Sequence, residues 1–328
     1  MQAIHPEDRK KNNNEKDGRV LILGICPNGK VYGYLASQNS PLATSILSEL
    51  FDPSSGKTIQ NFPLAGSPDA NKTALIVRLK NIVQSGWHES MRMYPDGSKR
   101  PYLAQNGGGY TLEALFDIIP NGKAEPDYKG WELKSLAGTR ITLMTPEPDG
   151  GFYNEAGAKT FTLQYGHDSP DVIKYFTGTH KADVKNTTSN LTLTIKGYDK
   201  TRRAISDVQG GVYLLNDHQE PVAIWSFSSL ITHWSRKHAH ACYVKYVTAS
   251  KNGKNGFIYH SPVYLGEKTD ISFFLESMQN GLIVYDPATK VVQNSNGNTS
   301  VKARSQFRIN FNNLKTLYEK FYEQAVIV

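Results

Sequence analysis

Residues 107–134 read GGGYTLEALFDIIPNGKAEPDYKGWELK, and we predict that short neighbouring elements in this stretch bring together three of its carboxylates, Glu113, Asp127 and Glu132, with Lys134. Asp127 follows Pro126, and the residue pair favours extended backbone, so we expect a strand to begin here. After a turn at residues 129–130, the run WELK at residues 131–134 alternates apolar and charged side chains, as a half-buried strand does. We therefore predict two adjacent strand ends that carry acidic groups.

On such a strand Glu132 and Lys134 share one face, while Trp131 and Leu133 point into the protein. Asp127, at the neighbouring strand end, is expected to lie beside Glu132. Two carboxylates close together suit a hard divalent ion such as Mg²⁺. The ammonium group of Lys134 beside that ion suits the stabilisation of an attacking water and of charge that builds on a phosphate. These residue types favour a nuclease site.

A third carboxylate, Glu113, stands upstream on a predicted helix. We expect residues 107–109 to interrupt any earlier element, Thr111 to cap the helix and Pro120 to end it. Glu113 in the first turn would then reach the same metal site. Two simpler interpretations stay open: a glutamate in a first turn is favoured by the helix dipole, and an edge strand can carry Glu-x-Lys on its solvated face.

Three linked segments, GGGYTLEALFDI, AEPDYKGWELKS and ITLMTPEP, resemble the MvaI/BcnI restriction endonucleases, relatives of the mismatch repair nickase MutH within the PD-(D/E)xK nucleases. In that family a Gly-Tyr-Thr-Leu-Glu helix start precedes Glu-Pro-Asp and Glu-Leu-Lys. The matching residues here are Glu113, Asp127, Glu132 and Lys134. The resemblance extends more weakly from about residue 74 to the C-terminus, and the first seventy or so residues have no counterpart.

The resemblance implies an α/β (α+β) fold with a PD-(D/E)xK core: a mixed central sheet flanked by helices, a DNA-recognition lobe and an N-terminal extension. It implies a type II restriction endonuclease that uses Mg²⁺ to hydrolyse double-stranded DNA at a short C·G-rich palindrome, CC-N-GG in our prediction. In-line attack on the phosphodiester would leave 5′-phosphate and 3′-hydroxyl ends. Either a monomer or a homodimer is compatible with this expectation.

The C-terminal run VKARSQFRIN, residues 301–310, is predicted to be a strand with Lys302, Arg304, Gln306 and Arg308 on one face. Arginine can take both acceptors of a guanine, and aspartate can accept from a cytosine amino group. Because members of the resembled family read C·G pairs with arginines and an aspartate from this hairpin, the resemblance assigns base contacts to Asp286, Arg304 and Arg308. A solvated edge strand protected by charge is the alternative.

Other basic residues are weaker candidates for contact with DNA. Arg92 lies in the predicted loop 87–109, which leads to the helix of Glu113. Lys237 and His238 follow a predicted helix and match a Trp-x-x-Lys-His stretch that lies on the DNA-facing side in the resembled family. His238 could instead be a structural imidazole, or share a zinc site with Cys242, although no second pair of ligands stands at the usual spacing.

The chain has 328 residues and a formal net charge of +7, which suits a polyanionic partner. We expect an accessory N-terminal region at residues 1–69, a catalytic core at residues 70–175, and remaining core strands with the recognition lobe at residues 176–328. With two cysteines, no leader pattern and no apolar run near the ~20 residues that cross a bilayer, we expect a cytoplasmic protein without a membrane partner.

The periodicity predicts a helix at residues 74–84, strands at residues 161–165, 191–195 and 240–247, and a final amphipathic helix at residues 314–328. Residues 139–144 are expected to pair with the strand of Glu132.

Two other functions fit parts of this pattern. A nicking endonuclease of the MutH type would share the metal site and make only single-strand breaks. A retaining glycosidase would use Glu113 and Glu132 as acid and nucleophile and would need no Mg²⁺.

Overall fold

The computed structural model of the chain describes residues 19–25, 31–50, 68–104, 106–120 and 126–327. The chain divides into two compact units, Met1–Ser67 and Pro68–Val328. The division of the larger unit at residues 175 and 176 stays a prediction. Among the described residues, no helix is both long and apolar enough to span a membrane.

The smaller unit contains an antiparallel hairpin of β1 (Val20–Ile25) and β2 (Val31–Ala36), followed by α1 (Pro41–Ser45) and the π-helical turn η2 (Ile46–Leu50). The run RVLILGIC at residues 19–26 predicts a buried strand that turns back as a hairpin. The hairpin is present, but the predicted burial of its first strand is wrong, because Leu21 and Leu23 are 62% and 54% exposed. A two-stranded hairpin has no second layer of its own against which to bury both faces.

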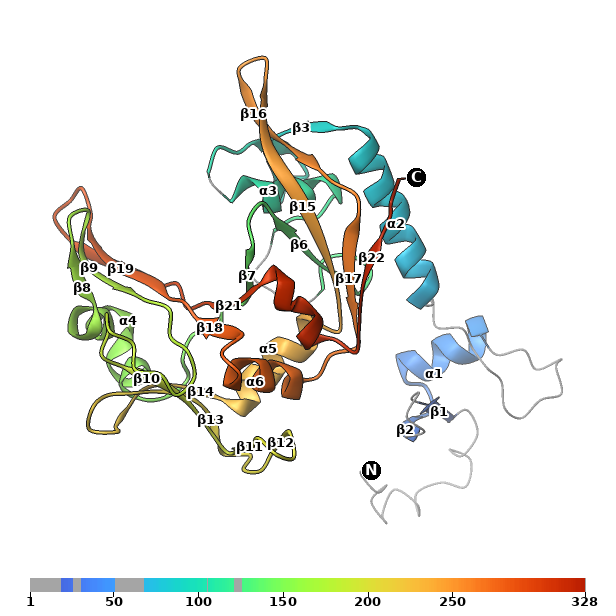
Figure 1. Ribbon diagram of the computed structural model, residues 1–328. Helices are drawn as coiled ribbons and strands as arrows, with labels where there is room; N and C mark the ends of the chain where they lie inside the picture. The colour runs from blue at the N-terminus through green and yellow to red at the C-terminus, as the bar shows by residue number, and fades with distance from the viewer. Residues whose placement is uncertain (1–18, 26–30, 51–67, 105, 121–125, 328) are drawn as a thin grey trace, which may run out of the picture. The chain divides into compact units, whose positions relative to one another are not determined.

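The larger unit is built on a main sheet whose strand order is β22-β17-β15-β16-β3, with β6 paired to β15 (Figure 1). Its strands are β3 (Trp87–Glu89), β6 (Glu132–Leu136), β15 (His240–Lys251), β16 (Lys254–Tyr259), β17 (Val263–Glu267) and β22 (Lys320–Gln324). Strand β6 runs parallel to β15, with Leu133 opposite Cys242 and Lys134 opposite Tyr243. The central strand of the core is therefore supplied by residues more than a hundred positions downstream of the Glu-x-Lys motif.

Two helices pack on this sheet, α2 (Pro68–Gln84) and α3 (Gly107–Leu115). Leu75, Leu79 and Ile82 of α2 repeat at helical spacing and are buried with Leu112 of α3 in one apolar cluster. Gly86 follows α2 with a φ of 73°, so the predicted helix and its stop are confirmed. This cluster also buries Trp131, Leu133 and Cys242 of the sheet, and it holds β6 in place from one side.

A smaller sheet stands beside the main one, in the order β18-β21-β7. Its strands are β7 (Arg140–Met144), β18 (Ile283–Tyr285) and β21 (Phe307–Asn310). The predicted pairing of residues 139–144 with the strand of Glu132 is wrong, because β7 pairs with β21. Bends at residues 137–139 separate β6 from β7 and carry the chain from one sheet to the other.

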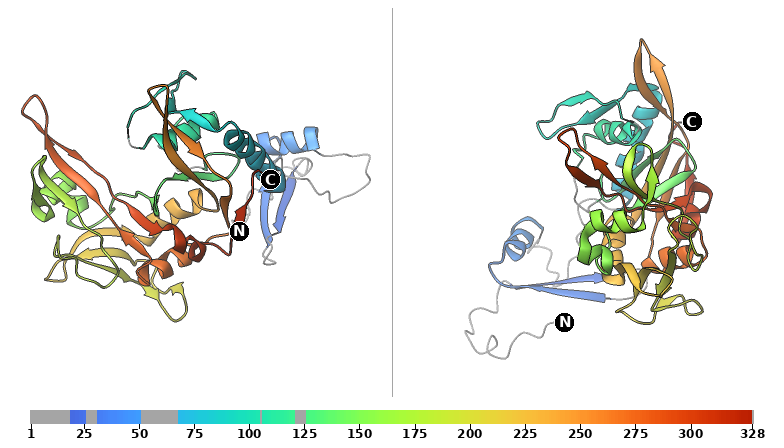
Figure 2. Two further views of the ribbon diagram at one scale, coloured as in Figure 1. Left: turned by 45° about the horizontal axis from the view of Figure 1, so that its top comes forward. Right: turned by 90° about the vertical axis from the view of Figure 1, so that its left-hand side faces the viewer.

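The remaining elements form a lobe with a second apolar cluster, which includes Phe161, Phe176, Trp225 and Phe307. Its sheets are β20-β19-β9-β8 and β10-β13-β14, and β11 pairs with β12. Their bounds are β8 (His167–Ser169), β9 (Val172–Thr177), β10 (Thr192–Lys196), β11 (Tyr198–Asp199), β12 (Ala204–Ile205), β13 (Gly211–Leu215), β14 (Pro221–Ser226), β19 (Ala288–Gln293) and β20 (Thr299–Lys302). The β15–β16 and β19–β20 hairpins extend as separate arms (Figure 2).

Helices α4 (Phe152–Tyr165), α5 (Phe227–Lys237) and α6 (Ile271–Gln279) complete the larger unit, together with the hairpin β4 (Met91–Met93) and β5 (Lys99–Pro101). The strand expected at residues 161–165 is wrong, since these residues end α4. The C-terminal helix expected at residues 314–328 is also wrong, because residues Phe311–Leu317 form a 3-10 turn, η4, and β22 then joins the main sheet. A short apolar run cannot by periodicity alone distinguish a strand from one helical turn.

Two of the three glycines at the start of α3, Gly107 and Gly108, allow the helix to touch the main sheet directly. A Cβ atom on Gly108 would lie 2.3 Å from the ring of Tyr246, whereas one on Gly109 would meet nothing closer than Ser135 Oγ at 3.8 Å. We expect Gly108→Ala to lower the free energy of unfolding by about 1–3 kcal/mol, because the packed ring must shift. Gly109→Ala should instead stabilise by up to about 1 kcal/mol, since alanine favours a helix.

Urea unfolding of the two variants measures this difference. Equal stability of both variants would mean that Tyr246 moves without cost, and that the glycine at position 108 has no packing role.

Candidate active site

Glu132 and Lys134 lie at the beginning of β6. The alternation of the strand directs both side chains away from the apolar cluster that contains Trp131, Leu133 and the buried residues of α2 and α3. Lys134 Nζ donates to Glu132 Oε1 at 3.2 Å. The two side chains are 16% and 5% exposed, with the lysine the more open of the pair. Trp131 and Leu133 are buried, as predicted. The ammonium of Lys134 is a cation beside a deeply buried carboxylate, so the two side chains form one electrostatic site.

Asp127 lies in the bend before β6 rather than on a strand of its own, which corrects the prediction of a strand start. Its Oδ2 accepts a hydrogen bond from the backbone N–H of Leu133 at 2.9 Å. The turn between them is closed by reciprocal backbone bonds between Tyr128 and Trp131. Asp127 is therefore fastened to the same strand end that presents Glu132.

Glu113 lies in the second half of α3, because the helix begins at Gly107 with Asn106 as its N-cap. The predicted cap at Thr111 is wrong. Thr111 is buried inside the helix, where its Oγ1 accepts from Met91 N at 3.0 Å and so attaches α3 to β4. The phenol of Tyr259 lies near Glu113: burial raises the pKa of Tyr259, and the nearby Tyr246 and Glu113 side chains raise it further.

The structure does not gather the three carboxylates into one site. Among the described residues no group of three histidine, cysteine, aspartate or glutamate side chains is placed to hold a metal ion. The role of Asp127, Glu132 and Glu113 as metal ligands stays a prediction: Asp127 and Glu132 lie at one strand end, and Glu113 lies on a separate helix. The oxygen donors of that pair are the type a hard divalent cation takes, so their chemistry fits such an ion.

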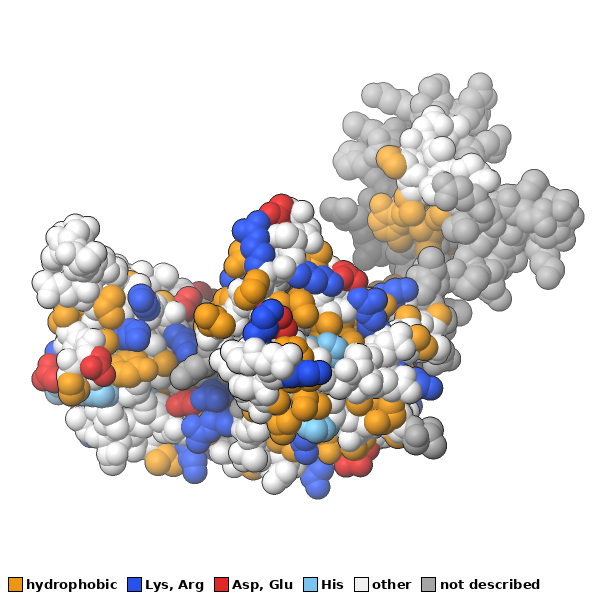
Figure 3. Space-filling model, turned by 90° about the horizontal axis from the view of Figure 1, so that it is seen from above, with side chains coloured by type: hydrophobic (Ala, Val, Ile, Leu, Met, Phe, Trp, Pro, Cys, Tyr) orange, Lys and Arg blue, Asp and Glu red, His pale blue; other side chains and the backbone are white. Residues whose placement is uncertain are grey.

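A groove opens beside Lys134. It runs from the start of α3 across the bends between β6 and β7 to β21, and its lining includes Asn106, Lys134, Arg140, Tyr246 and Arg308. Viewed from above, Lys and Arg side chains gather along the middle of this face next to a hollow (Figure 3). A groove lined by Lys134, Arg140 and Arg308 suits a polyanionic ligand.

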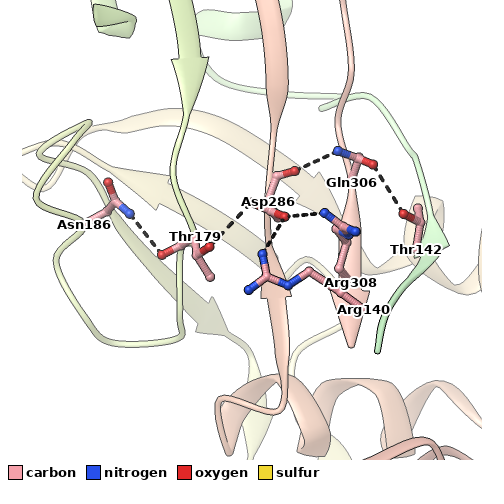
Figure 4. Close-up of polar contacts among 7 residues, drawn as sticks. All are labelled: Arg140, Thr142, Thr179, Asn186, Asp286, Gln306 and Arg308. Atoms are coloured by element: carbon pink, nitrogen blue, oxygen red, sulfur yellow. Dashed lines mark hydrogen bonds and ion pairs between the residues drawn. The ribbon is translucent and has the colours of Figure 1, made fainter. Parts of the chain in front are cut away.

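Asp286 lies near that groove and holds two arginines (Figure 4). Its Oδ2 accepts from Arg308 Nη1 at 2.8 Å and from Arg140 Nη1 at 3.3 Å, and its Oδ1 accepts from Thr179 Oγ1 at 3.5 Å. Gln306 Nε2 donates to the backbone oxygen of Asp286 at 3.0 Å. The aspartate is therefore fixed from several elements, with guanidinium groups on the groove side.

His180 supports this arrangement from the core of the lobe. Its backbone exchanges two hydrogen bonds with Tyr285, the residue before Asp286, and its ring lies against Phe176 and Tyr285. Burial lowers the pKa of His180 to about 4, so the imidazole is neutral at pH 7. A neutral buried ring adds no charge to compete with the arginines for Asp286.

The predicted row of Lys302, Arg304, Gln306 and Arg308 does not form one exposed face. Lys302 and Arg304 are exposed, Arg308 is partly buried, and Gln306 is 4% exposed. The chain is also not one continuous strand here, because β20 ends at Lys302 and β21 begins at Phe307. Between them, backbone hydrogen bonds from Ala288 N to Arg304 O and from Asp286 N to Gln306 O still join this segment to residues 286–288. Gln306 faces inward because Asp286 and Thr142 bind its amide.

Arg92 lies on β4, with its guanidinium 4.6 Å from the ring centroid of Tyr110 and 5.7 Å from that of Tyr94. These rings orient the arginine beside the first residues of α3. The prediction that Arg92 contacts DNA is compatible with this position and stays a prediction.

His238 is inconsistent with the predicted contact to DNA. It caps α5, is fully buried, stacks on Trp234 with ring centroids 4.2 Å apart, and its Nε2 lies 3.0 Å from the oxygen of Leu143 on β7. It is a structural imidazole, the alternative that the sequence left open. The side chain of Lys237 lies outside the described part of the chain.

The sequence did not indicate Arg140, Thr142 or Thr179 as site residues. Arg140 begins β7, the strand that follows the Glu-x-Lys strand in the chain. Its closeness in sequence to Lys134 is the one feature that could have indicated a site residue. Thr179 and Thr142 carry no such signal, because each reaches Asp286 or Gln306 only through the folding of distant strands.

A mixed sheet with Glu-x-Lys on a strand next to a cationic groove fits the PD-(D/E)xK class of nuclease folds. The model of the MvaI/BcnI restriction endonuclease family matches residues 76–318. The chain belongs to this family and is a type II site-specific deoxyribonuclease. Restriction endonucleases of this kind generally use divalent metal ions, and membership excludes the glycosidase alternative.

A solved structure supports the fold. The complex of restriction endonuclease MvaI with its cognate DNA substrate is 17% identical, has a TM-score of 0.60, and the match covers 78% of this chain and 98% of that chain. Restriction endonuclease MvaI in the absence of DNA is also 17% identical, with a TM-score of 0.42 and coverage of 82% and 100%. No curated protein sequence matches this chain.

Proposed function

We propose that this endonuclease uses Mg²⁺ to cut double-stranded DNA at a short C·G-rich palindrome with a CC-N-GG-like core, leaving 5′-phosphate and 3′-hydroxyl ends. The observation that carries the proposal is the buried Glu132–Lys134 pair, whose lysine opens into a groove that Arg140 and Arg308 also line. In this proposal the cations along the groove bind the DNA backbone, and a phosphate reaches the Glu132–Lys134 pair from the groove at Lys134.

In this proposal Asp127 and Glu132 hold the divalent ion, and Glu113 contributes from α3. When bound, the ion acts as a Lewis acid on the phosphate and lowers the pKa of the attacking water. Lys134 orients that water and offsets the negative charge that develops on the phosphate oxygens. The hydrogen bond from Leu133 N keeps Asp127 at the end of β6, so the two carboxylates keep their spacing.

The base-reading residues in this proposal are Asp286, Arg304 and Arg308. Asp286 and Arg308 stand side by side as an acceptor and a donor, which is the pattern that a C·G pair requires in the major groove. Arg92 and the exposed Lys302 bind backbone phosphates, which position the duplex without reading its sequence.

We propose a cytoplasmic enzyme that works as a monomer or a homodimer, with no membrane partner. Supercoiled plasmid distinguishes double-strand cleavage from the nicking alternative, because a nicking enzyme stops at open circles.

Removal of divalent ions is expected to abolish cleavage. Digestion of unmethylated phage DNA should give discrete fragments with Mg²⁺, and no fragments with EDTA, because a water molecule without the ion is a poor nucleophile at neutral pH. Sequencing the fragment ends gives the recognition site, and ligation without prior kinase treatment tests for 5′-phosphates. Fragmentation in EDTA would contradict the role of the metal, and fragment ends without a shared sequence would contradict the C·G-rich site.

A further inference from the structure

One carboxylate oxygen holds two guanidinium groups at the groove. Asp286 Oδ2 is bound by Arg308 and by Arg140, so this cluster carries two positive charges for one negative charge (Figure 4). An ionised carboxylate can accept about four hydrogen bonds, so both arginines can bind it in the absence of another donor. A third donor that approaches this oxygen must compete with one of them.

The two ion pairs are unequal. The Arg308 pair measures 2.8 Å and the Arg308 side chain is 26% exposed, whereas the Arg140 pair measures 3.3 Å and the Arg140 side chain is 53% exposed. The attraction between a guanidinium group and a carboxylate weakens as their distance and their exposure to water increase. Arg308 also stands opposite Val284 in the sheet that leads into Asp286. Arg140 is therefore the partner that leaves Asp286 more easily.

The difference between the two ion pairs matters because the Asp286 side chain is largely buried. The Asp286 side chain is only 16% exposed, so a cytosine amino group that approaches its Oδ2 competes with the two arginines already bound there. Arg140 comes from β7, whose chain connects directly to β6 through residues 137–139, and it lines the same groove as Lys134. A displaced Arg140 thus remains beside the catalytic lysine.

We infer that Arg140 is a positioning residue that changes partner on the correct DNA sequence. When Asp286 accepts a hydrogen bond from a cytosine amino group, Arg140 leaves it and binds a backbone phosphate in the groove beside Lys134. On an incorrect sequence Asp286 lacks the amino donor and keeps Arg140. The inference rests on the proposed function and couples base recognition by Asp286 to the hold on the strand that is cut.

The salt dependence of DNA binding tests the change of partner. Each phosphate contact contributes about one unit to the slope of log affinity against log salt concentration. We expect Arg140→Gln to lower this slope by about one on a duplex with the recognition site. On a duplex in which the C·G pair read by Asp286 is replaced by T·A, the slope should not change. Fluorescence anisotropy in EDTA measures the binding affinity, and hence the slope, on each duplex without cleavage.

Two further variants give the controls. Arg140→Lys keeps the charge and is expected to keep the wild-type slope on the recognition site. Arg203→Gln removes an exposed arginine that pairs with Glu276 at 3.1 Å and does not line the groove, so it should match wild type on both duplexes. Thermal unfolding of each variant confirms that the compared proteins are folded.

Equal losses of slope on both duplexes would overturn the inference, because Arg140 would then bind phosphate on every sequence. Unchanged slopes on both would also overturn it, since Arg140 would then make no phosphate contact. If wild-type protein binds the two duplexes with equal affinity, the proposed C·G recognition itself fails, and this result is visible without any Arg140 variant.

Discussion

Replacement of Lys134 by methionine is expected to lower the rate of DNA cleavage by about 10²–10³-fold, the usual loss when one preorganised group that stabilises transition-state charge is removed. Methionine keeps most of the stem of lysine and removes the ammonium that lies 3.2 Å from Glu132 Oε1. The measurement is the single-turnover rate of plasmid cleavage at saturating Mg²⁺, together with the affinity for the same DNA. Affinity should change much less than rate.

Lys245→Met is the matched control for this variant. Lys245 stands opposite Leu136 on the strand next to β6, and its ammonium lies over the rings of Tyr264 and Phe311 at 4.8 Å and 4.2 Å. It is not part of the groove lining. We expect wild-type cleavage from it. Cleavage at full speed by Lys134→Met, with DNA bound normally, would remove Lys134 from the reaction.

Lys134→Met also has an expected cost in stability, because the Glu132 side chain is 5% exposed and loses the cation beside it. Thermal unfolding therefore accompanies the kinetics, so that a loss of folded protein is not counted as a loss of catalysis. The addition of Glu132→Gln to Lys134→Met removes the buried charge and should recover part of the stability without recovering cleavage.

The local part of the site could be predicted from the sequence because it depends on the period of a single strand. Alternation alone indicated that Trp131 and Leu133 are buried and that Glu132 and Lys134 share the opposite face. The helix of residues 74–84 was predictable for the same reason, since its apolar stripe is a local pattern.

The remaining features depend on pairs of residues far apart in the chain. Nothing in residues 131–136 indicates that β15 is their parallel neighbour. The next strand in the chain, β7, is the neighbour that the sequence alone predicts, and it pairs with β21 instead. The run of glycines before Glu113 predicts a break, but in the structure it is helical, and Gly108 gives the space for contact with Tyr246 on a distant strand. The burial of Gln306 has a similar origin, since Asp286 and Thr142 hold its amide.

Asp127→Asn is expected to reduce cleavage by about 10²–10³-fold while the fold is retained. The amide oxygen of asparagine can still accept the hydrogen bond from Leu133 N that Asp127 Oδ2 accepts at 2.9 Å, but the negative charge beside Glu132 is gone. A weaker hold on Mg²⁺ should also raise the Mg²⁺ concentration needed for half-maximal cleavage. A Mg²⁺ titration of the cleavage rate measures both effects.

Asp127→Ala separates the two tasks of this residue. It removes the charge and the hydrogen bond together, so it should match Asp127→Asn in cleavage and be about 1 kcal/mol less stable in urea unfolding. If Asp127→Asn cleaves at the wild-type rate and only Asp127→Ala is impaired, Asp127 serves only to fasten the turn to β6. The charge that Mg²⁺ requires would then have to come from Glu132 and Glu113, and α3 would have to approach the end of β6 when DNA binds.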